Sequence, residues 1–173
     1  MSEKTGRSSR RRAREVALQV LYAIDLALRE RPVDASANQT SASQEKAKVD
    51  VLAIASAQTQ PCAAFDAVAK HFEMPVGART FAKELAVQVR EQVDELDQEI
   101  TAHAENWRIA RMAAVDRNIL RLGTYELRFT DTPTAIILNE AVDLARRYGS
   151  DPSPAFVNGI LDAVARGVRE VSE

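Results

Sequence analysis

The side chains of this chain best suited to binding a ligand are arginines near its N-terminus. Arg10, Arg11, Arg12 and Arg14 fall within five consecutive positions. Positive charge at this density attracts polyanions such as nucleic acids. A short arginine run is equally typical of a basic tail in solvent. The run alone leaves both interpretations open.

The helix that the run opens favours a bound anion. Apolar residues recur at three- and four-residue steps after the arginines, as in one face of an amphipathic helix: Ala13, Val16, Ala17, Val20, Leu21, Ile24 and Leu28. A helix N-terminus carries partial positive charge, so each exposed arginine there costs about a few tenths of a kcal/mol. A docked polyanion would remove that penalty and also contact the helix N-terminus.

Residues that could support catalysis are few and scattered. His71 and His103 lie in different predicted helices without partners at metal-ligand spacing. Cys62, the only cysteine, lies in an alanine-rich stretch where a structural thiol is a simpler interpretation than a nucleophile. No glycine-rich phosphate loop occurs. The sequence therefore predicts no catalytic residue, no bound metal and no cofactor.

Charge is unevenly distributed along the 173 residues. Residues 1–14 hold six basic side chains and one acidic side chain, a net charge of +5. Because the formal net charge of the whole chain is −2, residues 15–173 carry a net charge of −7. A basic arm on an acidic body indicates a local polyanion site together with acidic surface for a basic partner. The single cysteine excludes an internal disulfide, and no signal peptide or membrane span is predicted. We expect a cytoplasmic protein.

The elements that must position these residues all read as helices. The first helix is predicted from about residue 9 to 31, before Pro32. Residues 32–48 are rich in Ser, Ala and Gln and read as a loose connection. The later helices are predicted at about 49–60, 62–72, 81–103, 109–112, 115–127, 133–148 and 153–168. A turn is expected at residues 73–77.

Three local signals predict how the C-terminal helices begin and end. Thr132 is a candidate N-cap with Pro133 at the first helical position, and Ser153 with Pro154 repeats the pattern. Gly149 is a candidate left-handed C-cap. Trp107 is expected to anchor the core. With no alternating strand pattern in the chain, the fold class is predicted as an all-α bundle.

Several segments in order resemble the NusB family of bacterial transcription antitermination factors. The matching segments are residues 10–15 with Tyr22, residues 107–127 around Val115-Asp116-Arg117-Asn118, residues 133–145 around Asn139-Glu140-Ala141, and residues 156–162. The resemblance covers residues 10–30 and about 80–167. It implies a compact bundle of about seven helices in two three-helix subdomains. Residues 1–9 would form a flexible basic arm, and residues 10–173 one domain with a variable insertion at 32–48.

The resemblance also implies a non-catalytic function and its partners. NusB-like proteins pair with NusE, a small-subunit ribosomal protein, and bind boxA-type RNA in ribosomal RNA transcripts as part of an RNA polymerase antitermination complex. It assigns RNA contacts to Arg10, Arg11, Arg12, Arg14 and Phe156. It assigns partner contacts to Tyr22, Asp116 and Asp151.

Some of these assignments have an alternative structural interpretation. Phe156 could be a core residue below the Pro154 turn, and Tyr22 could pack beside Ile24. Pro152 stands where relatives place an acidic residue that contacts NusE, with Asp151 as its substitute. This departure puts the affinity for NusE in question.

Two other function classes remain open from the sequence. One is the NusB-like N-terminal part of a ribosomal RNA cytosine methyltransferase, although no nucleotide-cofactor fold follows residue 173. The other is a plain helical interaction module in which the arginines have no role. The sequence does not decide between a monomer and a homodimer, nor does it define the RNA sequence bound.

Overall fold

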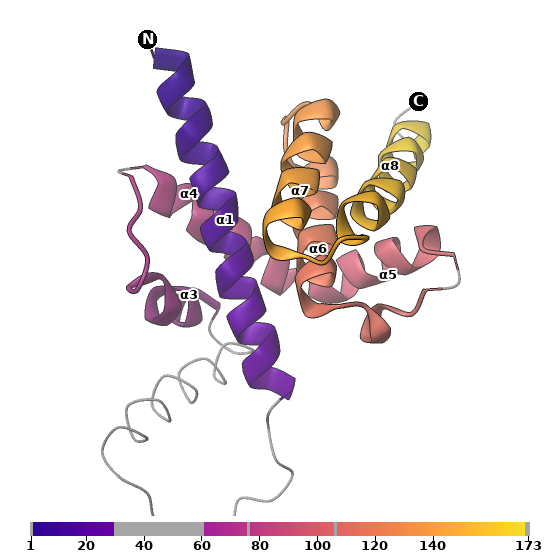
Figure 1. Cartoon of the computed structure of the whole chain (residues 1–173), viewed down its shortest axis with the longest axis horizontal. Helices are drawn as coiled ribbons and strands as arrows, with labels where there is room; N and C mark the ends of the chain where they lie inside the picture. The colour runs from indigo at the N-terminus through magenta and orange to yellow at the C-terminus, as the bar shows by residue number, and fades with distance from the viewer. Residues whose placement is uncertain (1, 30–60, 76, 106, 172–173) are drawn as a thin grey trace, which may run out of the picture. The chain divides into compact units, whose positions relative to one another are not determined.

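In the computed structural model the described residues are 2–29, 61–75, 77–105 and 107–171. Seven α-helices and one 3-10 helix account for most of them, and no strand occurs among them (Figure 1). The helices are α1 (Ser2–Arg29), α3 (Pro61–Ala69), α4 (Ala78–Glu91), α5 (Val93–His103), η2 (Ile109–Arg111), α6 (Ala114–Phe129), α7 (Thr134–Tyr148) and α8 (Ser153–Val171). The all-α prediction is confirmed. The predicted helix at 49–60 and the insertion at 32–48 lie outside the described residues.

The chain divides into two compact units, residues 1–87 and 88–173. The first unit contains α1, α3 and most of α4. Its apolar face on α1 is the one predicted, because Ala13, Val16, Val20 and Ile24 are all at most 2% exposed. The helix begins at Ser2, seven residues before the predicted start.

Within the first unit, α3 contacts α1 and is tied to α4 by charge. Asp66 accepts hydrogen bonds from Lys83 Nζ at 2.7 Å and Arg79 Nη2 at 3.2 Å. The hydrogen bond from Lys83 and the two nearby positive charges hold the pKa of Asp66 below its ordinary value of 3.8, with partial burial opposing them. The turn between α3 and α4 contains Gly77 at φ +89°, a conformation that favours glycine.

The second unit packs α6, α7 and α8 against one another, with α5 against α6 and α8. Its core is formed by apolar side chains that recur at helical spacing, including Ile119, Leu122, Ile137, Leu161 and Val164. The predicted single helix over 81–103 is wrong in one respect. Gln92 (φ −105°, ψ 16°) interrupts it, giving α4 and α5, although backbone hydrogen bonds continue across the break.

The predicted caps of the C-terminal helices are also corrected. Pro133 occupies the N-cap position of α7, and its carbonyl accepts from Ile137 N at 3.2 Å. Ser153 Oγ accepts a hydrogen bond from Ser150 N at 2.9 Å, so it stabilises the preceding loop.

Gly149 is extended (φ −93°, ψ −168°), not left-handed. A Cβ at Gly149 would lie 2.6 Å from Ser153 Cβ and 2.7 Å from Ala145 O. Close approach of the backbone therefore explains this glycine.

Candidate nucleic-acid interface

The four predicted arginines lie in α1, and the structure places them in different surroundings. Arg10 and Arg11 are exposed, Arg12 is half-buried, and Arg14 is only 3% exposed. A helix turns by about 100° per residue, so four near-consecutive side chains cannot share one face. Arg10 and Arg11 are therefore the two that a phosphate reaches most directly, and the prediction of an RNA contact by Arg14 stays a prediction.

Phe81 of α4 lies beneath two of these arginines. The guanidinium carbons of Arg10 and Arg14 are 5.9 Å and 5.8 Å from the centre of its ring, within the range of a cation–π interaction. Phe81 is half-buried, so the ring is held while one end of the stack remains open to solvent. Phe81 is the first residue of the helix predicted over 81–103, and no binding role was predicted for it.

Arg12 is held by a carboxylate of its own helix. Its Nη1 donates to Glu15 Oε2 at 2.9 Å, and its Nη2 approaches the Glu73 carbonyl at 3.4 Å. Glu15 is 5% exposed, and the pair is one turn apart. The bound carboxylate offsets part of the charge of Arg12, and Arg12 is also less exposed than Arg10 and Arg11.

A second group of candidate residues lies in the second unit around Phe156. This ring, near the start of α8, is half-buried and packs edge-on against Trp107, with the ring centres 4.9 Å apart and the planes at 62°. Trp107 is 53% exposed, so the prediction that it anchors the core is wrong. It lies in the connection between α5 and η2, outside any helix whose apolar face would cover it.

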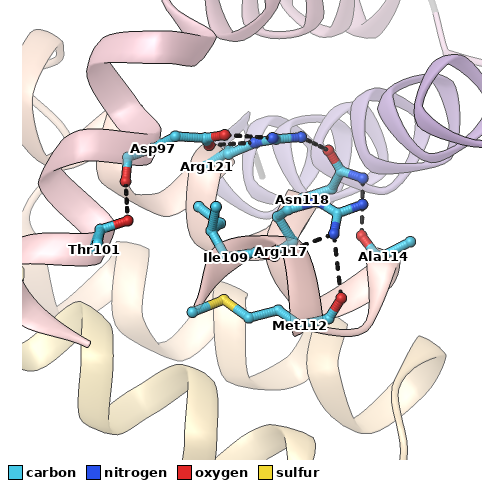
Figure 2. Close-up of polar contacts among 8 residues, drawn as sticks. All are labelled: Asp97, Thr101, Ile109, Met112, Ala114, Arg117, Asn118 and Arg121. Carbon is cyan, nitrogen blue, oxygen red and sulfur yellow. Dashed lines mark hydrogen bonds and ion pairs between the residues drawn. The ribbon is translucent and has the colours of Figure 1, made fainter. Parts of the chain in front are cut away.

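Buried polar side chains of α6 hold that connection in place (Figure 2). Arg117 Nη1 donates to the carbonyls of Ile109 at 3.3 Å and Met112 at 3.2 Å, which fixes both ends of η2. One turn later Arg121 forms a bidentate ion pair with Asp97 of α5, at 2.6 Å and 2.7 Å. Asn118 joins Arg121 to the first turn of α6. It accepts a hydrogen bond from Arg121 Nη1 at 3.3 Å and donates one to the Ala114 carbonyl at 2.8 Å.

This network was not predicted from the sequence. Arg117 is 3% and Arg121 8% exposed, although both side chains are charged. The sequence does contain one indication of their burial. Arg117 and Arg121 are four residues apart, so they share a helix face with Leu120 and Thr124 and do not lie on the solvent side.

The three predicted partner contacts differ in accessibility. Tyr22 is 38% exposed, and Leu26 one turn later is 43% exposed, so α1 presents an apolar strip. Asp151 is exposed. Asp116 is 7% exposed, and its Oδ1 is buried without a hydrogen-bond partner among the described residues. Only Tyr22 and Asp151 can meet a partner without local movement.

The residues considered for catalysis do not assemble into a site. Cys62 is exposed at the start of α3. His103 Nδ1 contacts the Glu99 carbonyl of its own helix at 3.0 Å, while His71 is exposed after α3. Among the described residues, no three His, Cys, Asp or Glu side chains cluster as metal ligands. None of the described helices has the length and apolar character needed to cross a bilayer.

Comparison with known proteins gives a consistent result over nearly the whole chain. The model of the NusB family matches residues 11–166. Transcription antitermination protein NusB of Myxococcus xanthus is 39% identical over 158 residues, covering 91% of this chain and 94% of the relative. The protein of the same name from Sorangium cellulosum is 50% identical over 94 residues, covering 54% of this chain and 67% of the relative.

Solved structures agree with the sequence relatives. T. maritima NusB superposes with a TM-score of 0.62 at 28% identity, covering 91% of this chain and 90% of that one. A chain from the structure of antitermination factors NusB and NusE in complex with double-stranded RNA gives a TM-score of 0.65 at 27% identity, covering 92% and 98%. The relatives are named as antitermination proteins rather than enzymes, in agreement with the predicted non-catalytic function.

Proposed function

Because this chain belongs to the NusB family, we propose that it is an RNA-binding transcription antitermination factor that acts with NusE. The observation that carries the proposal is the pair of exposed arginines in α1, Arg10 and Arg11, with the guanidinium carbon of Arg10 5.9 Å from the centre of the Phe81 ring. A solved relative is bound to both NusE and RNA, which supports the same pairing here.

The RNA in this proposal is a single-stranded boxA-type element of a ribosomal RNA transcript. Arg10, Arg11 and Arg12 contact its phosphates, Arg14 supports them through Phe81, and Phe156 belongs to the base-contacting surface. Single-stranded RNA suits this arrangement because its bases are free to stack on aromatic rings while its phosphates pair with arginines.

NusE binds the acidic remainder of the chain in this proposal. Tyr22 and Asp151 are the accessible contacts, and Asp116 takes part after local movement of the first turn of α6. Charge complementarity between an acidic surface and a basic ribosomal protein raises the association rate and orients the partner more than it adds affinity. The complex then joins RNA polymerase in the cytoplasm.

Fluorescence anisotropy of a labelled boxA-like RNA and of a scrambled RNA tests the proposal, with and without NusE. The expected result is a preference for boxA that NusE strengthens and that Arg10→Ala/Arg11→Ala reduces at least tenfold. The matched control is Arg146→Ala/Arg166→Ala, which removes the same charge from exposed ion pairs in α7 and α8. Equal losses in both variants, or equal binding of both RNAs, would contradict the proposal.

A further inference from the structure

Trp107 is the most exposed large apolar side chain of the described residues, and nothing in the proposed function accounts for it. A single exposed apolar residue is common in soluble proteins and carries no inference by itself. Three further observations distinguish this one: a ring that holds the indole, an anchored backbone, and two adjacent cations.

Phe156 holds the indole at a defined angle. Edge-to-face packing at 4.9 Å and 62° is a favourable arrangement of two aromatic rings, and it engages the indole without covering its exposed half. Since Phe156 is the more buried of the two rings, it acts as the support and Trp107 presents the accessible surface.

Backbone hydrogen bonds hold Trp107 and the η2 segment that follows it. Trp107 N donates to the Ala104 carbonyl at 3.1 Å, and Arg111 N donates to the Arg108 carbonyl at 2.8 Å. Arg117 donates hydrogen bonds to the carbonyls of Ile109 and Met112 (Figure 2). Binding to such a platform orders few new torsions, so little conformational entropy is lost.

Two arginines close to Trp107 in the sequence carry charge that the described part of the chain does not neutralise. Arg108 and Arg111 are exposed, and neither guanidinium forms an ion pair or hydrogen bond with a described residue. The acidic neighbour is Glu105, which leaves the segment with a net positive charge. An anionic ligand with a flat aromatic part matches this surface.

We infer that Trp107 is a nucleobase-stacking residue for single-stranded RNA, supported by Phe156 and flanked by Arg108 and Arg111 as phosphate contacts. The inference rests on the proposed function and extends it to a residue outside the N-terminal arginines. A protein partner is the weaker match, because stable protein interfaces bury about 800 Å² per partner around an apolar centre, whereas here one indole lies among charged side chains.

Trp107 is the only tryptophan of the chain, so its fluorescence reports this site alone. The test titrates the full-length protein with a boxA-like RNA while RNA anisotropy and Trp107 emission are followed in parallel. We expect RNA to quench the emission and to lower the accessibility of the indole to acrylamide. Trp107→Ala should weaken binding about tenfold, Trp107→Phe should stay within threefold, and Phe129→Ala, an exposed aromatic of α6, is the unaffected control.

The two arginines and Phe156 are tested by different measurements. Arg108→Gln/Arg111→Gln should reduce the slope of log K against log salt by about 1.4, since each phosphate contact on a single strand contributes about 0.7. Phe156→Leu should speed the local rotation of the indole in time-resolved anisotropy and weaken RNA binding, and Phe156→Tyr should restore both. A purely structural role of Phe156 would leave the rotation of the indole unchanged.

The outcomes separate this inference from the proposed function. RNA binding with unchanged Trp107 emission and unchanged affinity of Trp107→Ala would overturn the inference and leave the proposed function standing. Absence of RNA binding by anisotropy would overturn both. Weaker NusE binding by Trp107→Ala at unchanged RNA affinity would identify a protein-docking surface and also overturn it.

Discussion

At the scale of single residues, Phe81 determines how the N-terminal arginines are presented. Its ring lies between 5.8 Å and 5.9 Å from two guanidinium carbons, which limits the rotamers of long and otherwise mobile side chains. Ordering those side chains before RNA arrives reduces the entropy lost on binding. An aliphatic residue of similar volume would fill the space without attracting the cations.

Phe81→Leu should therefore weaken RNA binding about two- to fivefold, corresponding to a cation–π contribution of roughly 0.5–1 kcal/mol. Phe81→Tyr keeps the ring face and should bind as the unchanged protein does. Anisotropy titrations at fixed salt measure both, with circular dichroism to check that helix content is equal. Equal affinity of the Leu and unchanged proteins would mean that the ring serves packing alone.

Gly149 and Gly159 form a matched pair for a stability prediction. A Cβ at Gly149 would lie 2.6 Å from Ser153 Oγ and 2.7 Å from a backbone carbonyl, whereas a Cβ at Gly159 meets nothing within 4 Å. Gly149→Ala should lower the free energy of unfolding by about 1–3 kcal/mol through overpacking. Gly159→Ala, inside α8, should raise it by up to about 1 kcal/mol through helix propensity. Urea unfolding of both variants measures the difference, and changes of the same sign would refute this account.

At the scale of elements, α5 is fastened to α6 by the ion pair between Asp97 and Arg121. The two side chains are 23% and 9% exposed, so solvent screens them weakly. Asp97→Ala leaves a largely buried guanidinium without its carboxylate and should cost about 2–4 kcal/mol of unfolding free energy. The control is Arg146→Ala, because the Arg146 side chain is 67% exposed and its ion pair with Asp143 should contribute less than about 0.5 kcal/mol. A similar loss of unfolding free energy in the two variants would show that burial does not strengthen the ion pair between Asp97 and Arg121.

The attachment of α3 to α4 through Asp66 should depend on pH. The pKa of Asp66 is lowered in the folded state, so its contribution is present above the unfolded value of 3.8 and is lost as pH falls through the folded value. The side chain is 48% exposed, which limits the effect to less than about 1 kcal/mol. Asp66→Asn should thus be less stable than the unchanged protein at pH 7 and equally stable near pH 2, as measured by urea unfolding. A constant difference at both pH values would contradict this assignment.

Helical periodicity was sufficient to predict most elements but not their ends or their polar interior. Apolar spacing identified the buried faces of α1, α6 and α8, because burial of such faces largely determines where helices form. The prediction of a left-handed cap at Gly149 was wrong. Glycine is selected both where φ is positive and where neighbouring atoms leave no room for a Cβ, and the sequence does not distinguish these two causes. The prediction that Trp107 lies in the core was wrong, because it relied on the large apolar side chain alone. Trp107 lies in a connection between helices, and this position leaves it exposed.

At the scale of the whole molecule, the chain is acidic while its proposed RNA contacts are basic. Residues 1–14 carry +5 and the remainder −7, so the body repels RNA in general and binding depends on local cations. Repulsion by the body is screened by salt, but the release of counterions from contacted phosphates dominates the salt dependence. The slope of log K against log salt therefore counts the contacted phosphates.

The two sets of proposed contacts predict different slopes. Arg10, Arg11 and Arg12 alone would give about −2, at about 0.7 per phosphate on a single strand, whereas adding Arg108 and Arg111 would give about −3.5. Between 50 and 200 mM salt these slopes correspond to roughly 20-fold and 130-fold losses of affinity. Anisotropy titrations across that range distinguish them, with Arg10→Ala/Arg11→Ala lowering either slope by about 1.4. A slope near zero would mean that phosphate contacts contribute little to RNA binding.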